Sequence, residues 1–99
     1  MSRETGDALC TQLVRAHGTF QGVGLGEACR EKALSLRIAG WLRHFEDGSV
    51  ELMLQGSTER VDMMCDWIVH GDHDALLETI EVIDLAPPVA RYAGFNVSR

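Results

Sequence analysis

The sequence has no long hydrophobic run, few aromatic residues and too few basic residues to balance its acidic ones. Only 6% of its 99 residues are aromatic, and no stretch approaches the roughly 18 apolar residues needed to span a bilayer. Residues 1–7 are polar and lack the basic segment followed by an apolar one that marks a secretory leader. We therefore expect a cytoplasmic protein that does not associate with membranes.

The shortage of positive charge restricts the partners. Nine Lys and Arg residues against fifteen Asp and Glu residues give a net charge of −6. This charge repels a polyanion over roughly 8 to 10 Å at physiological salt. Nucleic acid is therefore not expected as a partner. A small phosphate or carboxylate ligand would have to be held by local backbone amides and nearby arginines.

Cysteine is also scarce, and no cluster of side chains has the spacing of a metal site. Cys10, Cys29 and Cys65 are odd in number and too few for a disulfide framework, so we expect reduced, packed thiols. The His and Asp residues within 70–74 offer nitrogen and oxygen donors, but their spacing favours a polar loop after a helix. The sequence therefore predicts no metal site.

What is present is the patterning of one folded domain. With 45% hydrophobic residues, the chain suits a folded domain at 8–99 preceded by a flexible tail at 1–7. Helical spacing predicts one helix at 25–36 and another between an N-cap at Ser57 and Gly71. Alternation and composition predict strands at 8–16, 41–45, 50–55, 78–84 and 93–98.

The order of these elements predicts the fold. Strand, helix, strand, strand, helix, strand is the order of the α+β ferredoxin-like split βαβ sandwich (βαββαβ), in which two helices cover one face of an antiparallel sheet. Residues 46–49 form the turn of the central hairpin. In the strand that follows, Val50, Leu52 and Leu54 alternate with the residues between them, which predicts a hairpin buried on one face.

A glycine-rich loop, residues 17–26, joins the first strand to the first helix. It reads His-Gly-Thr-Phe-Gln-Gly-Val-Gly-Leu-Gly. Glycines permit positive φ angles, so successive amide N–H groups at the positive end of a helix dipole can point toward one anion. The expected anion-binding residues are Phe20, Gln21, Gly22, Val23, Gly24 and Leu25. The alternative is a tight connection whose glycines only permit the turn.

Three segments of the chain resemble the acylphosphatase family. Residues 18–25 are similar to the family's Gly-x-Val-Gln-Gly-Val-Gly-Phe-Arg signature, and Gly-Trp-Leu-Arg-His at 40–44 is similar to its Gly-Trp-Val-x-Asn pattern. Residues 87–95 resemble its closing segment. The resemblance covers roughly residues 9 to 98. It implies the same fold and the hydrolysis of carboxyl-phosphate anhydrides without a metal or organic cofactor.

Both positions that carry the chemistry of that family are substituted. Gly26 stands where the family has its phosphate-binding arginine, and His44 stands where it has the asparagine that orients water. Removing one preorganised donor to a developing oxyanion costs roughly 100- to 1000-fold in turnover. We therefore expect a pseudoenzyme that binds anions through its backbone but has lost, or strongly reduced, its hydrolase activity.

Two alternatives remain open. The first is an active acylphosphatase, in which Arg30, one helical turn after Gly26, replaces the missing arginine and His44 positions water. Against this, Arg30 is also expected as an exposed helix residue paired with Glu27 or Glu31. Weaker candidates for the replacement are Arg15 and Arg43. The second alternative is a non-enzymatic module that binds a protein partner through the sheet.

Overall fold

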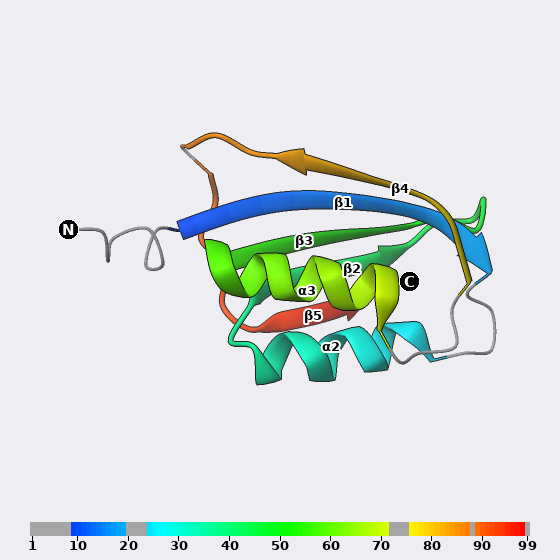
Figure 1. Ribbon diagram of the computed structural model, residues 1–99, viewed down its shortest axis with the longest axis horizontal. Coiled ribbons are helices and arrows are strands. Elements are labelled where there is room, and N and C mark those ends of the chain that lie inside the picture. Colours follow the sequence, from blue (N-terminus) through cyan, green and yellow to red (C-terminus); the bar gives the residue numbers. More distant parts are fainter. Residues whose placement is uncertain (1–8, 20–23, 72–75, 88, 99) are drawn as a thin grey trace.

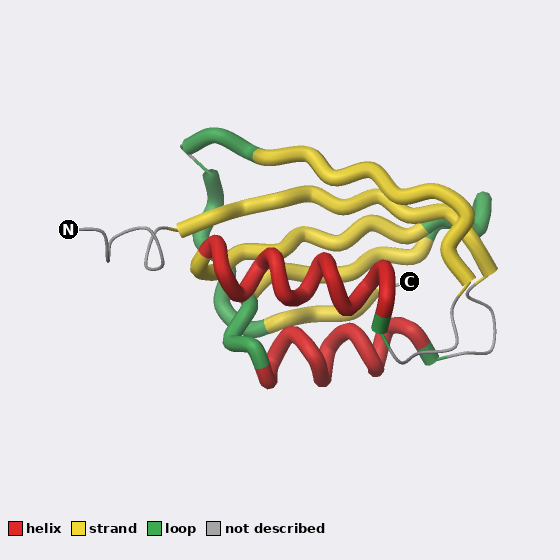
Figure 2. The backbone as a smooth tube through the Cα atoms, viewed as in Figure 1, coloured by secondary structure: helices red, strands yellow, loops and turns green. Residues whose placement is uncertain are grey.

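The computed structural model describes residues 9–19, 24–71, 76–87 and 89–98. Five strands form one sheet, and both helices lie on the same face of it (Figure 1; Figure 2). The predicted ferredoxin-like α+β fold is confirmed. Within the described ranges, no helix is long and apolar enough to cross a membrane.

The elements follow the predicted order. The sheet has the spatial order β4-β1-β3-β2-β5. Three strand pairs, β1–β3, β1–β4 and β2–β3, are antiparallel as predicted, whereas β5 lies parallel to β2. The element bounds are β1 Leu9–Thr19, α2 Leu25–Ser35, β2 Ala39–His44, β3 Val50–Ser57, α3 Thr58–His70, β4 Leu76–Asp84 and β5 Phe95–Ser98.

The local signals in the sequence set the ends of the central elements. Between β2 and β3, the Asp47 carboxylate accepts hydrogen bonds from the Ser49 amide at 2.9 Å and from the Ser49 hydroxyl at 2.6 Å. These bonds hold the pKa of Asp47 below its usual value. At the start of α3, the Ser57 hydroxyl accepts a hydrogen bond from the Arg60 amide at 3.3 Å. The predicted turn and the predicted N-cap at Ser57 are confirmed.

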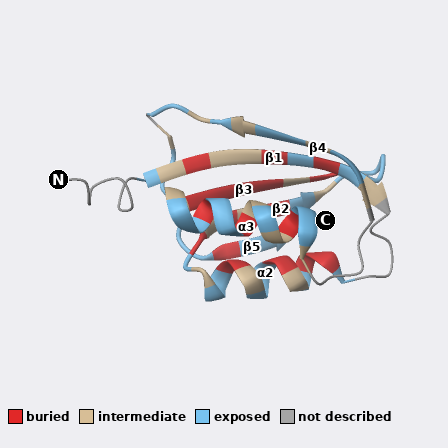
Figure 3. Cartoon of the chain, in the orientation of Figure 1, coloured by how far each residue is buried: buried red, intermediate tan, exposed pale blue. Residues whose placement is uncertain are grey.

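The core lies between the sheet and the two helices, where the buried residues of both helices and of β1, β2, β3 and β5 meet (Figure 3). Along β1, Val14 and Ala16 point into this layer, and Arg15 between them points to the opposite face. Cys29 is part of the same core, and burial raises the pKa of its thiol to about 12. The three cysteines are free thiols. The largest fully buried side chains are Ile38, Leu42, Leu52, Leu54, Met64, Val14, Val50, Val61 and Cys29.

The face of β3 away from the helices is also buried, which the alternation of this strand does not predict. Met53 is only 9% exposed and Gln55 only 3%. The Gln55 side chain donates to the Thr11 hydroxyl at 3.1 Å and to the Ala90 carbonyl at 2.7 Å, and it accepts from the Tyr92 amide at 3.0 Å. Gln55 thus fixes the connection between β4 and β5 to the sheet.

Replacing Gln55 tests this attachment. In Gln55→Ala, three groups lose their partner, so we expect the free energy of unfolding to fall by about 2–3 kcal/mol. Urea denaturation followed by circular dichroism measures the loss. Gln12→Ala is the comparison variant, because Gln12 donates to the Asp84 carboxylate at an exposed contact and accepts from the Cys65 thiol at a part-buried one, and so has fewer buried partners than Gln55. An equal fall in the free energy of unfolding in both variants would show that the buried hydrogen bonds of Gln55 contribute no more to stability than those of Gln12.

Candidate functional site

The described residues of the glycine-rich loop are the end of β1, at 17–19, and the beginning of α2, at 24–26. Gly24 is the N-cap and has the left-handed φ of 65°, a conformation that residues with a Cβ rarely adopt. Its carbonyl accepts the first helical hydrogen bond, from the Ala28 amide at 3.1 Å. A glycine N-cap has no side chain to occupy the amides of the first turn, which leaves them as donors. The other predicted anion ligands, at 20–23, lie outside the described residues.

The two substituted family positions lie next to each other in space. Gly26 is buried in the first turn of α2, and His44 is the last residue of β2. A Cβ built on Gly26 would lie 3.4 Å from His44 Cε1 and 2.8 Å from Val97 Cγ1, on the neighbouring strand β5. The space beside the helix that a longer residue at position 26 would need is therefore taken by His44 and Val97.

His44 is held in this position by the last strand. It is half-buried, and its Nδ1 lies 3.4 Å from the Ser98 carbonyl oxygen of β5. A carbonyl only accepts hydrogen bonds, so this contact favours the tautomer that carries the proton on Nδ1. Cε1, which lies between the two ring nitrogens, is the His44 atom that comes nearest to the Cβ built on Gly26. The imidazole of His44 therefore lies between β5 and the first turn of α2.

Arg30, the possible replacement for the family arginine, lies on the exposed side of α2, as expected for a helix surface residue. Gly26 one turn earlier is buried, so the two residues do not share the same surroundings. In the part of the chain that the structure describes, no ion pair joins Arg30 to Glu27 or Glu31. Glu27 is exposed in the first turn of α2, where its negative charge competes with an anion.

The two weaker replacements, Arg15 and Arg43, have partners on the opposite face of the sheet. Arg15 Nε lies 2.8 Å from a Glu51 carboxylate oxygen, and its Nη1 lies 3.9 Å from Glu81. Arg43 stacks over the Trp41 ring at 4.5 Å from the ring centroid. Neither arginine lies beside α2, so neither supplies the missing charge.

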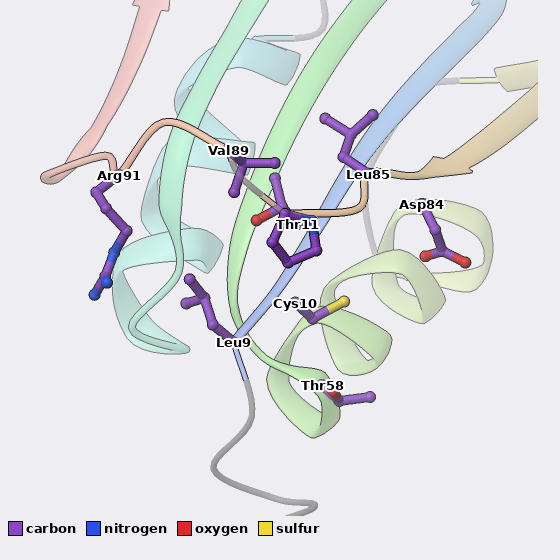
Figure 4. A pocket seen from close by; sticks show the side chains of 9 residues that line it. Leu9, Cys10, Thr11, Thr58, Asp84, Leu85, Val89 and Arg91 are labelled. Carbon is purple, nitrogen blue, oxygen red and sulfur yellow. The ribbon is translucent and has the colours of Figure 1, made fainter.

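A pocket of about 460 Å³ lies at the other end of β1 (Figure 4). Residues from the start of β1, the start of α3 and the connection after β4 surround it. Cys10 is its potential nucleophile, but burial, with Asp84 and Asp62 nearby, raises the pKa of the thiol. This pocket is separate from His44 and was not indicated by any motif. Its lining residues are Leu9, Cys10, Thr11, Thr58, Asp84, Leu85, Pro87, Val89 and Arg91.

The described ranges hold no cluster of three or more His, Cys, Asp or Glu side chains that could bind a metal ion. His70 is the last residue of α3, where a basic side chain suits the negative end of the helix dipole. The remaining members of the histidine and aspartate group, within 72–75, lie outside the described residues. Among the described residues, the first turn of α2 offers backbone amides, and His44 lies beside it.

The chain is similar to known proteins both in sequence and in fold. The acylphosphatase family model matches residues 12–97. Acylphosphatase 1 of Ralstonia nicotianae is 44% identical over 89 residues, which are 90% of this chain and 87% of that protein. The acylphosphatase of Polaromonas naphthalenivorans is 46% identical over 84 residues, covering 85% and 83% of the two chains. The structure of an acylphosphatase from Coxiella burnetii superposes with a TM-score of 0.83 at 26% identity and covers 98% of this chain and 99% of that one.

Proposed function

Since the chain belongs to the acylphosphatase family, we propose that it binds a small phosphate or carboxylate group but hydrolyses acyl phosphates slowly or not at all. One observation carries this proposal. The position of the family arginine is a buried glycine packed against Val97 and His44, and neither Arg15 nor Arg43 lies near it. In the described residues, the position that the resemblance assigns to the phosphate-binding arginine therefore carries no positive charge.

Binding and catalysis depend on different groups in this site. Backbone N–H donors at a helix N-terminus attract an anion whatever the side chains are. A charge-assisted hydrogen bond contributes about 1.5 to 3 kcal/mol, so its loss weakens binding by tenfold or more. The transition state of phosphoryl transfer depends almost entirely on positioning and charge stabilisation. Loss of the cation therefore reduces turnover more than binding.

The competing function is an active acylphosphatase. The curated relatives of this length are named acylphosphatases, which favours activity. Arg30 would then have to reach from the exposed side of α2 to the phosphate, while His44 positions the attacking water. This function predicts that removal of the Arg30 guanidinium abolishes turnover.

Two measurements on the full chain test the proposal. Titration with inorganic phosphate, followed by backbone amide NMR, is expected to shift the Gly24 and Leu25 signals and the amides of 20–23. Hydrolysis of benzoyl phosphate is expected to be little above the uncatalysed rate. Arg30→Ala should leave both results unchanged, and Arg60→Ala on α3 is the matched surface control. Rapid hydrolysis that Arg30→Ala abolishes would replace the proposal with the active enzyme, and unchanged amides would remove the anion site.

A further inference from the structure

β4 is an outer strand of the sheet and, among the described strands, pairs with β1 alone (Figure 1). The outer side of such a strand leaves backbone N–H and C=O groups without a partner, and proteins usually shorten, cover or charge it. β5, at the other edge of the sheet, has four residues, whereas β4 has nine. Because β4 lies at the edge opposite β5, an inference about it does not depend on the proposed function.

The hydrogen bonds to β1 determine which backbone groups of β4 point outward. The Leu85 amide donates to the Thr11 carbonyl at 2.9 Å, so these two residues are a hydrogen-bonded pair at the end of the ladder. Hydrogen-bonded and non-hydrogen-bonded pairs alternate along an antiparallel ladder. The N–H and C=O groups of Ile80, Val82 and Asp84 therefore point away from β1. In the part of the chain that the structure describes, no other strand pairs with them.

The side chains of Ile80, Val82 and Asp84 lie on the helix side of the sheet. Residues opposite each other on paired strands share a face, and Ile80 and Val82 lie opposite the core residues Ala16 and Val14. Val82 is nevertheless 46% exposed, because α3 packs on β1 and β3. A strand added beside β4 would cover this apolar side chain as well as the free backbone groups.

The same edge is acidic. β4 contains no basic residue, and its acidic residues are Glu78, Glu81 and Asp84. Burial raises the pKa of the Cys65 thiol on α3 to about 11, and the nearby carboxylates of Asp62 and Asp84 add to this effect. Asp62 thus adds a negative charge from α3 on the helix side. On the other face, Arg15 Nη1 lies 3.9 Å from Glu81 and is shared with Glu51.

We propose that the β4 edge, residues 78–84, binds an extended segment of a partner protein that is rich in Lys and Arg. The segment adds a strand to the sheet through the outward backbone groups, and its basic side chains meet the carboxylates. A second copy of this chain fits less well, because each copy has a net charge of −6 and would bring an acidic strand of its own. The charge of the edge therefore selects a basic strand over self-association.

The probe is the peptide Lys-Thr-Val-Lys-Ile-Thr-Lys with blocked ends. Paired antiparallel to β4, it places its valine and isoleucine against the apolar residues of the edge and its lysines against the three carboxylates. Amide NMR titration of the full chain is expected to give saturable shifts at Ile80, Val82 and Asp84. Exchange of the lysines for glutamate should weaken binding at least about tenfold. Methylation of the valine and isoleucine nitrogens should abolish binding, because it removes the backbone donors.

Variants of the protein assign the binding to β4. Val82→Pro removes an outward N–H and leaves the bonds to β1 in place, as proline does on edge strands, and should weaken binding about tenfold. Glu78→Gln with Asp84→Asn keeps every backbone group and should weaken binding roughly three- to tenfold. The matched control removes two exposed carboxylates elsewhere, in Glu31→Gln with Glu46→Gln, and should leave the affinity unchanged. Circular dichroism checks that each variant folds.

Each result supports or overturns the inference. Equal affinity for the lysine and glutamate peptides, or equal losses in the two double variants, would overturn the selection of a basic partner. Unshifted amides at Ile80 and Val82 would overturn β4 as the site, and this outcome does not require Val82→Pro to fold. A dimer of the unmodified protein in sedimentation experiments, with contacts at β4, would assign the edge to a second copy. The phosphate titration reports on the other edge of the sheet, so its result stands apart from all of these.

Discussion

Benzoyl phosphate hydrolysis is expected to rise by at least about 100-fold when Gly26→Arg and His44→Asn are combined with Val97→Ala. The first two substitutions restore the residues that the family resemblance assigns to phosphate binding and water positioning. A restored donor to the developing charge contributes roughly 100- to 1000-fold. Val97→Ala is needed because a Cβ at position 26 would lie 2.8 Å from Val97 Cγ1, closer than packed carbon atoms approach. Steady-state kinetics on the three-residue variant measure the gain.

The intermediate variants identify the source of the gain. Gly26→Arg with His44→Asn alone should gain less, because Val97 must first move away. Gly26→Lys in place of Gly26→Arg is the matched control, since lysine provides charge without the planar fork that binds phosphate in a bidentate manner. A three-residue variant that folds, binds phosphate and still fails to hydrolyse benzoyl phosphate would show that the site lacks more than these two side chains.

Gly40→Ala is expected to lower the free energy of unfolding by about 3–5 kcal/mol, through overpacking and backbone strain together. A Cβ on Gly40 would overlap the backbone carbonyl of Met53 on the paired strand, and the φ of 145° is one that alanine rarely adopts. Neither β2 nor β3 can yield easily, because their buried residues fill the core. Urea denaturation measures the loss.

Gly48→Ala provides the comparison for Gly40→Ala. Gly48 also has a positive φ, 91°, but a Cβ there would meet nothing within 4 Å. Only backbone strain of about 1–2 kcal/mol is expected. Similar losses in the two variants would show that the close approach of β2 and β3 at Gly40 contributes little.

The arrangement of elements could be predicted because local signals and periodicity agree. Helical spacing and the N-cap at Ser57 define α3, and the turn after β2 is fixed by the Asp47 side chain. The ends of other elements depend on pairing with distant strands. β1 continues to Thr19, beyond the predicted end at 16, because Gly18 and Thr19 pair with Leu77 and Leu76 of β4. The local sequence pattern of β1 gives no information about a partner strand that lies far away in the chain.

The burial of Gln55 is a second point at which the structure differs from the prediction made from the sequence. Polar residues that alternate with apolar ones normally face solvent, so the pattern in β3 predicts an exposed side chain. In the structure the connection after β4 crosses over Gln55 and satisfies its amide at three points. The same connection carries the chain from β4 at one edge of the sheet to β5 at the other edge, where β5 pairs in parallel with β2.

The candidate site was predictable in its residues but not in its geometry. Motif comparison indicated Gly26 and His44 as the positions that matter, and the structure places them side by side. Motif comparison did not indicate Val97 or Ser98, because only the tertiary fold brings β5 beside Gly26 and His44. From the sequence, Arg15 and Arg43 were candidates to replace the missing arginine. In the structure their side chains contact partners on the face of the sheet away from the helices.

The parallel course of β5 has a practical consequence for recombinant work. Because Val97 packs beside Gly26 and the Ser98 carbonyl contacts His44, a purification tag fused after residue 99 would begin within one residue of these contacts. A polyhistidine tag there would add ionisable imidazoles directly after β5. Fusion at the amino end, ahead of β1, keeps the foreign sequence at the opposite end of that strand.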